Sequence, residues 1–138
     1  MVASYDGSMI VTGSDEGEIL SWNVEEGIRM QTFNGHSDGI RGLFLIQDGA
    51  YFISISRDRS IRIWDFTSAE CVSTIEVGDV LCCGVINPTT TRLFTGSNAK
   101  TIKEWCNTFN YQNRYFLYMN NFKATKRFLE ILKTAGDS

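Results

Sequence analysis

The sequence predicts an all-β protein built from three copies of one unit, and two observations lead to this fold class. Three tryptophans, Trp22, Trp64 and Trp105, lie 42 and 41 residues apart. Each of them ends a short apolar run, and turns rich in Gly, Asp and Ser separate such runs by roughly 8 to 12 residues, as in all-β domains. A chain that resembles itself at a period of about 40 residues predicts a repeat architecture.

The middle unit has the most complete order of elements. An apolar run follows Gly35-His36, a turn at Asp48-Gly49 leads to a second run, and residues 57–59 form the next turn. The alternation of apolar and polar residues at 61–63 indicates a strand with one wet face, which ends in Trp64-Asp65. We expect strands in this unit near residues 39–46, 50–56, 60–66 and 71–76.

The period, the Gly-His pair and the Trp-Asp pair together resemble the WD-repeat family of β-propellers, in which each repeat is a four-stranded antiparallel blade. The resemblance implies a hydrogen-bonded set made of a His, a strand Ser or Thr, a turn Asp and the Trp. In this chain the matching residues are His36, Ser54, Asp58 and Trp64. The physical chemistry agrees, because a buried indole N–H needs an acceptor and buried Ser and His side chains need partners.

The first and third units depart from this pattern. Thr12 and Thr95 keep the strand hydroxyl, but Glu16 and Ala99 stand where the middle unit has Asp58. We expect strands near residues 8–13, 17–23 and 28–33 in the first unit, and near 80–86, 92–97 and 101–105 in the third. The sequence thus predicts about ten strands in an incomplete propeller, with blades at residues 1–34, 35–76 and 77–106.

An incomplete propeller leaves apolar faces uncovered. A closed ring typically has about four to eight blades, so two and a half to three blades cannot close on themselves. The exposed end faces of a repeat array need protection from water. We expect the chain to be a fragment of a longer protein, to be completed by other chains, or to self-associate, in that order of preference.

The tail, residues 107–138, breaks the repeat and changes the charge. Residues 1–105 carry 8 Lys and Arg against 14 Asp and Glu, whereas residues 106–138 carry 5 against 2. Apolar residues recur there with helical spacing, which predicts a basic amphipathic helix over residues 121–134. The aromatic-rich run at 115–119 could instead form the missing fourth strand of the third unit. We expect the tail to pack over the last blade or to contact a partner, RNA or a membrane surface.

The sequence offers little for catalysis, metal binding or membrane insertion. His36 is the only histidine, and the resemblance gives it a structural role. The cysteines lack the paired spacing of zinc sites and are interpreted as reduced, apolar fillers: Cys71, Cys82, Cys83 and Cys106. No leader segment or membrane-length apolar run is recognisable. We therefore expect a soluble intracellular protein, in the first place cytoplasmic, that is not an enzyme and needs no cofactor or metal.

The resemblance implies a scaffold that binds other proteins. Turns between second and third strands, and the connections between blades, should share one face of the ring and present both charge signs. Such a surface suits peptide segments of partner proteins. The candidate contact residues are Asp15, Glu16, Ser37, Asp38, Arg57, Arg59, Asp79 and Lys100. The alternative function is a subunit of an RNA-containing or cytoskeletal assembly anchored by the basic tail.

Overall fold

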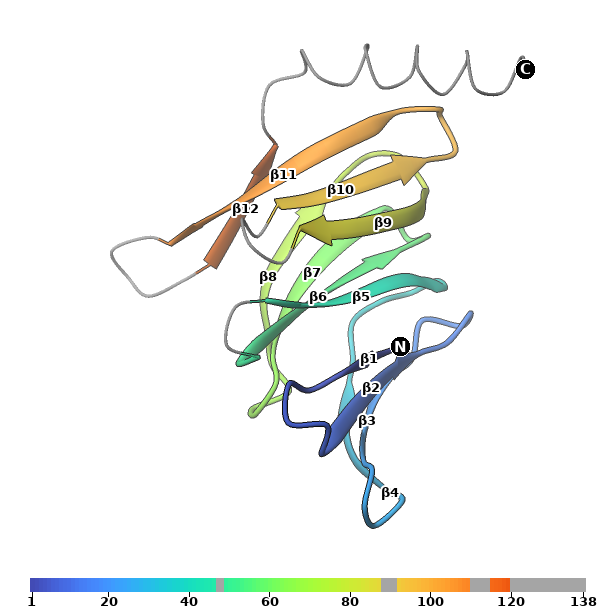
Figure 1. Ribbon diagram of the computed structural model, residues 1–138. Coiled ribbons are helices and arrows are strands. Elements are labelled where there is room, and N and C mark those ends of the chain that lie inside the picture. Colours follow the sequence, from blue (N-terminus) through green and yellow to red (C-terminus); the bar gives the residue numbers. More distant parts are fainter. Residues whose placement is uncertain (47–48, 88–91, 110–114, 120–138) are drawn as a thin grey trace, which may run out of the picture.

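Three antiparallel sheets make up the described part of the protein. The computed structural model describes residues 1–46, 49–87, 92–109 and 115–119, and its regular elements there are twelve β-strands. Each sheet contains four strands that are neighbours in chain order. Figure 1 shows the sheets stacked in the same order, with the second between the first and the third. The predicted all-β fold class is confirmed.

The strands of each sheet are consecutive in the chain. The first sheet consists of β1 (Val2–Ala3), β2 (Met9–Gly13), β3 (Ile19–Asn23) and β4 (Ile28–Phe33). The second consists of β5 (Ile40–Ile46), β6 (Tyr51–Ser56), β7 (Ser60–Asp65) and β8 (Cys71–Glu76). The third consists of β9 (Leu81–Asn87), β10 (Arg92–Ser97), β11 (Ile102–Phe109) and β12 (Tyr115–Met119).

The three tryptophans occupy equivalent places in the three sheets. Each lies on the third strand of its sheet and pairs with an apolar residue of the second strand: Ile10 with Trp22, Phe52 with Trp64, and Leu93 with Trp105. The turn that precedes this third strand also has one backbone shape throughout. The residue five places before each Trp has a positive φ, namely Gly17 (92°), Arg59 (71°) and Lys100 (60°). Glycine adopts this conformation freely, whereas it costs Arg59 and Lys100 roughly 1 to 2 kcal/mol each.

The second sheet is buried on both faces. Successive residues of a strand point to opposite faces, so one strand can contribute to two cores. Towards the third sheet it presents side chains with no exposed surface, which pack in one cluster with Leu81, Leu93 and Trp105: Ile53, Ile55, Ile61 and Ile63. Towards the first sheet it presents Phe52 and Trp64, which cluster with residues of β2, β3 and β4: Val11, Ile19 and Phe33.

Phe33 joins the first sheet to the second. Its ring is 1% exposed and meets Phe52 edge-on, with centroids 4.9 Å apart. It also meets Trp64 at 5.9 Å and Phe66 at 6.4 Å, both edge-on. This geometry is the favoured arrangement for aromatic pairs and adds to the energy of burying the rings. The last residue of β4 therefore holds the two sheets together.

The structure has two more strands than the ten or so that the sequence predicts. β1 pairs with β2 through Val2 and Ala3 only, and such a short strand leaves no periodic pattern. β12 pairs antiparallel with β11, which continues to Phe109, so the expectation of a third unit without a fourth strand is wrong. The alternative reading of residues 115–119 as that strand is right, and the third sheet extends beyond residue 106. The expected helix at 121–134 lies outside the described residues.

Two further features of the described part bear on function. It contains no helix that is long and apolar enough to cross a membrane. Cys71, Cys82 and Cys83 are free thiols; Cys71 is partly buried and the other two are exposed. The expectation that Cys82 and Cys83 fill apolar space is therefore wrong, because the first strand of the third sheet leaves both accessible to solvent.

We predict that Phe33→Ala destabilises the protein by about 3 to 5 kcal/mol, since it removes a buried ring between two sheets and leaves a cavity. Urea denaturation monitored by tryptophan fluorescence would measure the change. Met30→Ala is the matched control on the same strand, because Met30 is 50% exposed and its loss should change stability by less than about 0.5 kcal/mol. Equal effects of the two substitutions would contradict the role assigned to Phe33.

Candidate functional site

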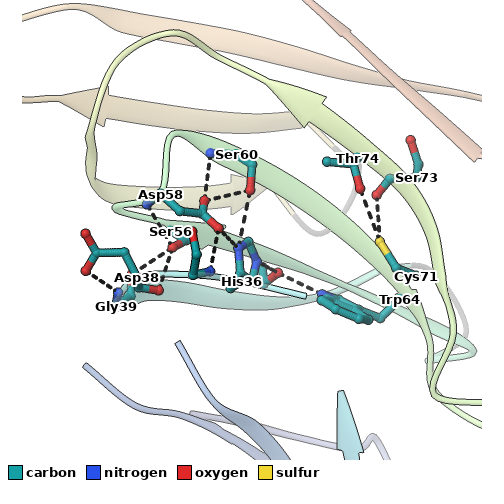
Figure 2. A network of polar contacts seen from close by, with 12 residues as sticks. His36, Asp38, Gly39, Ser56, Asp58, Ser60, Trp64, Cys71, Ser73 and Thr74 are labelled. Atoms are coloured by element: carbon teal, nitrogen blue, oxygen red, sulfur yellow. Dashed lines mark hydrogen bonds and ion pairs between the residues drawn. The ribbon is translucent and has the colours of Figure 1, made fainter. Parts of the chain in front are cut away.

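A chain of polar contacts runs through one end of the second sheet. Nε1 of Trp64 donates to Oγ of Ser54 at 2.8 Å, and Oγ of Ser54 lies 2.5 Å from Nε2 of His36. Nδ1 of His36 lies 2.7 Å from Oδ2 of Asp58. Figure 2 shows the network from close by, with His36 between the Asp58 turn and the Trp64 strand. The structure thus brings together the four residues that the family resemblance implies.

The proton positions in this chain follow from what each group can do. An indole N–H only donates and an ionised carboxylate only accepts, so Nδ1 of His36 carries the proton it shares with Asp58. A neutral imidazole then accepts at Nε2 from the Ser54 hydroxyl, which in turn accepts from Trp64. Burial lowers the pKa of His36 below 6.5, against the opposing effect of Asp58. The ring is therefore neutral at physiological pH.

Asp58 accepts the hydrogen bonds that hold the turn between β6 and β7 in place. Its side chain is 6% exposed, and it accepts from N–H and O–H of Ser60 at 2.9 and 2.6 Å and from N–H of Ser37 at 3.2 Å. Burial acts to raise the pKa of this carboxyl, but the hydrogen bonds from Ser60 and His36 together hold it below 3.8. Asp58 is thus ionised at neutral pH and ties the connection between β4 and β5 to the turn between β6 and β7.

Two serines of this network were not singled out from the sequence. Ser60 follows Asp58 by two residues, and this spacing is the signal of an Asx turn. Ser56 is fully buried, donates to the carbonyl of Asp38 at 2.8 Å and accepts from N–H of Asp58 at 3.1 Å. Its role depends on the packing of the β4–β5 connection, which no local sequence pattern reveals.

Of the contacts that lead from Trp64 to Asp58, the other two sheets keep only the first. Nε1 of Trp22 donates to Oγ1 of Thr12 at 2.9 Å, and Nε1 of Trp105 donates to Oγ1 of Thr95 at 3.0 Å. Neither sheet has a carboxylate in the place of Asp58 that is bound in this way, since Ala99 has none and Glu16 is exposed. The Trp–hydroxyl pair is thus common to all three sheets.

The turns and connections that were expected to share one face do lie together. N–H of Ile40 donates to the carbonyl of Ser14 at 2.9 Å, which joins the β2–β3 turn to the start of β5. N–H of Val77 donates to the carbonyl of Arg59 at 2.8 Å, which joins the β8–β9 connection to the β6–β7 turn. We call this surface the rim; it comprises residues 14–18, 34–39, 57–59, 77–80 and 98–100.

Three of the rim carboxylates lie next to a cation. Asp15 lies 3.6 Å from Arg41, Asp38 lies 3.8 Å from Arg57, and Asp79 lies 3.7 Å from Lys103. Arg41 and Lys103 were not predicted, because they come from strands rather than from the turns. These contacts are long and partly exposed, so each contributes at most about 1 kcal/mol to stability.

The remaining predicted contact residues extend into solvent. Glu16, Ser37, Arg59 and Lys100 are exposed, and their side chains take part in no ion pair within the described part of the chain. Backbone groups of Ser37 and Arg59 are nevertheless fixed by hydrogen bonds to Asp58 and Val77. The rim therefore presents free charges on ordered turns. Among the described residues, no group of three His, Cys, Asp or Glu could hold a metal ion.

We predict that Asp58→Ala lowers the free energy of unfolding by about 1 to 3 kcal/mol, because donors of His36 and Ser60 lose their acceptor. Glu16→Ala, the substitution at the aligned position of the first sheet, should change it by less than about 0.5 kcal/mol. Thermal and urea denaturation of the two variants would measure the difference. The reverse order of effects would contradict the roles given to these residues.

We also predict that stability falls with acidification because the pKa of His36 is lowered in the folded state. The folded protein binds the imidazole proton more weakly than the unfolded chain, so stability is fully present above pH 6.5 and declines as the pH falls through 6.5. NMR titration of the only imidazole would give its pKa, and urea denaturation at several pH values would give the decline. A pKa at or above 6.5, or greater stability in acid, would contradict this assignment.

Comparison with known proteins bears on the same residues. Residues 27–65, which run from the end of the β3–β4 turn to the end of β7, match the family model "WD domain, G-beta repeat". The chain is also similar to the pre-mRNA-splicing factor cwf17 of Schizosaccharomyces pombe, with 27% identity over 103 residues. This match covers 74% of the chain and 30% of the relative.

Two other relatives match shorter parts of the chain. Subunit I of eukaryotic translation initiation factor 3 from Drosophila simulans is 31% identical over 80 residues, which is 57% of this chain and 24% of that protein. The nuclear distribution protein PAC1 of Tuber melanosporum is 36% identical over 75 residues, which is 54% of this chain and 16% of that protein. The chain thus spans less than a third of the length of these relatives. The family match shows a WD repeat at residues 27–65, and the three four-stranded sheets with equivalent tryptophans agree with repeats of this kind.

Proposed function

We propose that this chain is a non-catalytic scaffold for protein–protein interaction that acts as part of a larger protein or complex. The observation that carries the proposal is the rim, where charged side chains of both signs extend from turns whose backbones are fixed by hydrogen bonds. Ordered turns bind with little loss of conformational freedom, and mixed charges favour some partners over others.

The relatives support this proposal in a general way. One is named as a subunit of a translation initiation factor and another as a pre-mRNA-splicing factor, and both names refer to processes inside the cell. We infer that this chain too is intracellular and that its partners are proteins, either peptide segments on the rim or further blades against the outer sheets.

The candidate contact residues are those of the rim. Asp15, Asp38 and Arg57 combine a neighbouring opposite charge with exposed surface, so a partner can exchange one ion pair for another at small cost. Glu16, Ser37, Arg59 and Lys100 are free to make new contacts. Asp79 is partly exposed beside Lys103.

A photo-crosslinking amino acid at Ser37 of the full chain should capture partner proteins in cells. The same amino acid at Ser68, an exposed residue of the β7–β8 turn at the other end of the second sheet, is the matched control and should capture far less. The combined substitution Arg57→Gln and Arg59→Gln should reduce capture at Ser37 severalfold without lowering the melting temperature. Equal capture at the two positions, or no effect of the double substitution, would contradict the proposal.

The alternative function, anchoring in an RNA-containing or cytoskeletal assembly, depends on the basic tail, most of which lies outside the described residues. Removal of residues 120–138 separates the two functions. A salt-sensitive binding to RNA that is lost with this segment would support the alternative, whereas crosslinking at Ser37 that persists without the segment would support the rim.

A further inference from the structure

The second and third repeats differ at one place on the rim. Two residues of these repeats are counterparts when they precede Trp64 and Trp105 by the same number of positions. The third repeat has Val77 for His36, Gly78 for Ser37, Ala99 for Asp58 and Thr101 for Ser60. The register of strands two and three is the same in both sheets. The connection before the first strand differs, because it spans residues 34–39 in one repeat and 77–80 in the other, and Gly78 has a positive φ where Ser37 has none.

The missing carboxylate changes the hydrogen bonds around it. In the second repeat the two groups of Ser60 donate to Asp58. In the third, Thr101 turns to Ser97 instead, with its N–H 3.4 Å and its Oγ1 2.7 Å from Oγ of Ser97. The N–H of Ser37 donates to Asp58, whereas the N–H of Gly78 donates to no group in the described part of the chain.

The space around this position is open. Gly78 is exposed, has a φ of 88°, and a Cβ placed on it would meet no atom within 4 Å. Ala99 is also exposed. Where the second repeat has a carboxylate that receives hydrogen bonds from its surroundings, the third repeat therefore has a free donor and solvent.

The two turns that carry Arg59 and Lys100 flank the open position. The segment 77–80 lies between two turns, since N–H of Val77 donates to the carbonyl of Arg59 at 2.8 Å and N–H of Asn98 donates to the carbonyl of Val80 at 3.0 Å. Arg59 and Lys100 stand in these turns with exposed side chains and with the strained positive φ described above. Glycine at either position would make the fold more stable than Arg59 or Lys100 does. The strained backbone therefore points to a function of the two cations other than stability.

The neighbouring acidic groups limit what can bind. Asp79 lies 3.7 Å from Lys103, which offsets part of its charge. Glu76, which pairs in register with Ser60, is exposed and has no ion pair within the described residues. The evenly spaced charges of a nucleic acid backbone would be repelled by Glu76 and by the other acidic residues of the rim, whereas a single carboxylate meets less of this repulsion.

We propose that Arg59, Gly78, Ala99 and Lys100 form a binding site for a carboxylate side chain of an acidic peptide in a partner protein. This site, which we call the Ala99 site, rests on the proposed scaffold function and names the chemistry of one of its partners. The bound carboxylate takes the place that Asp58 occupies in the second repeat. It accepts from the N–H of Gly78 and pairs with the two flanking cations.

The test uses the full chain labelled with ¹⁵N and a blocked hexapeptide with two central glutamates. Titration should shift the amide proton of Gly78 downfield, as expected when it gains an ionised acceptor, while the glutamine counterpart of the peptide should not. Anisotropy of the labelled peptide gives the affinity. A uridine hexanucleotide serves as the competing polyanion.

Four variants make the test specific. Ala99→Asp supplies an internal carboxylate and should weaken peptide binding about tenfold or more, whereas Ser68→Asp adds the same charge at the other end of the second sheet and should have little effect. Arg59→Gly and Lys100→Gly should each weaken binding about two- to fivefold and yet raise the melting temperature, because they relieve the positive φ. This combination cannot arise from misfolding. Glu76→Gln should strengthen binding.

Several results would overturn the Ala99 site. These are an unmoved Gly78 amide, equal binding of the glutamine peptide, undiminished binding to Ala99→Asp, or tighter binding of the uridine hexanucleotide through the same two cations. Failure of this site with persistent crosslinking at Ser37 would leave the scaffold function intact. A Gly78 shift without any crosslinking in cells would instead remove the scaffold function and keep the carboxylate site.

Discussion

The burial of the Trp64 indole is the constraint on which the rest of the second repeat depends. An aromatic side chain of this size buries roughly 150 to 250 Å², which stabilises the fold by about 4 to 6 kcal/mol, whereas its unpaired N–H would cost about 1 to 3 kcal/mol. Apolar burial therefore places the ring in the core, and the need of its N–H for an acceptor fixes its position there. Ser54 satisfies the N–H, His36 satisfies Ser54, and Asp58 satisfies His36, so one buried ring fixes the geometry of a turn at the protein surface.

The stacking of the sheets explains why the three repeats differ in their burial. The second sheet has a neighbour on each face, and five of the six residues of β6 are buried, so the strand reads as continuous core. The corresponding strand of the first sheet, β2, has one buried residue among its five. For the second strand of each sheet, burial thus depends on how many neighbours the sheet has, and the same strand has different sequences in different places of the stack.

Much of this fold could be predicted from the sequence, and the parts that could not have physical causes. The Trp period, the turns and ten strands follow from local patterns. Residues 115–119 fit both a helical face and a strand, and only pairing with β11, a tertiary interaction, decides between them. The contact of Asp15 with Arg41 crosses from one sheet to the next, so its existence depends on sheet packing and not on sequence spacing. Ser60 could have been found from the Asp-x-Ser spacing alone.

The three repeats also show why the rim can vary while the sheets stay the same. Trp105 keeps its hydroxyl partner, yet the third sheet lacks the His and Asp of the second, and its strands two and three hold the same register. Apolar burial between sheets, at several kcal/mol for each large side chain, exceeds what the polar network adds, so a repeat that loses His and Asp still folds. Its rim positions are then free to change charge without loss of the fold. In a stack of similar sheets, the repeats with the least complete networks are therefore where binding chemistry can diverge furthest.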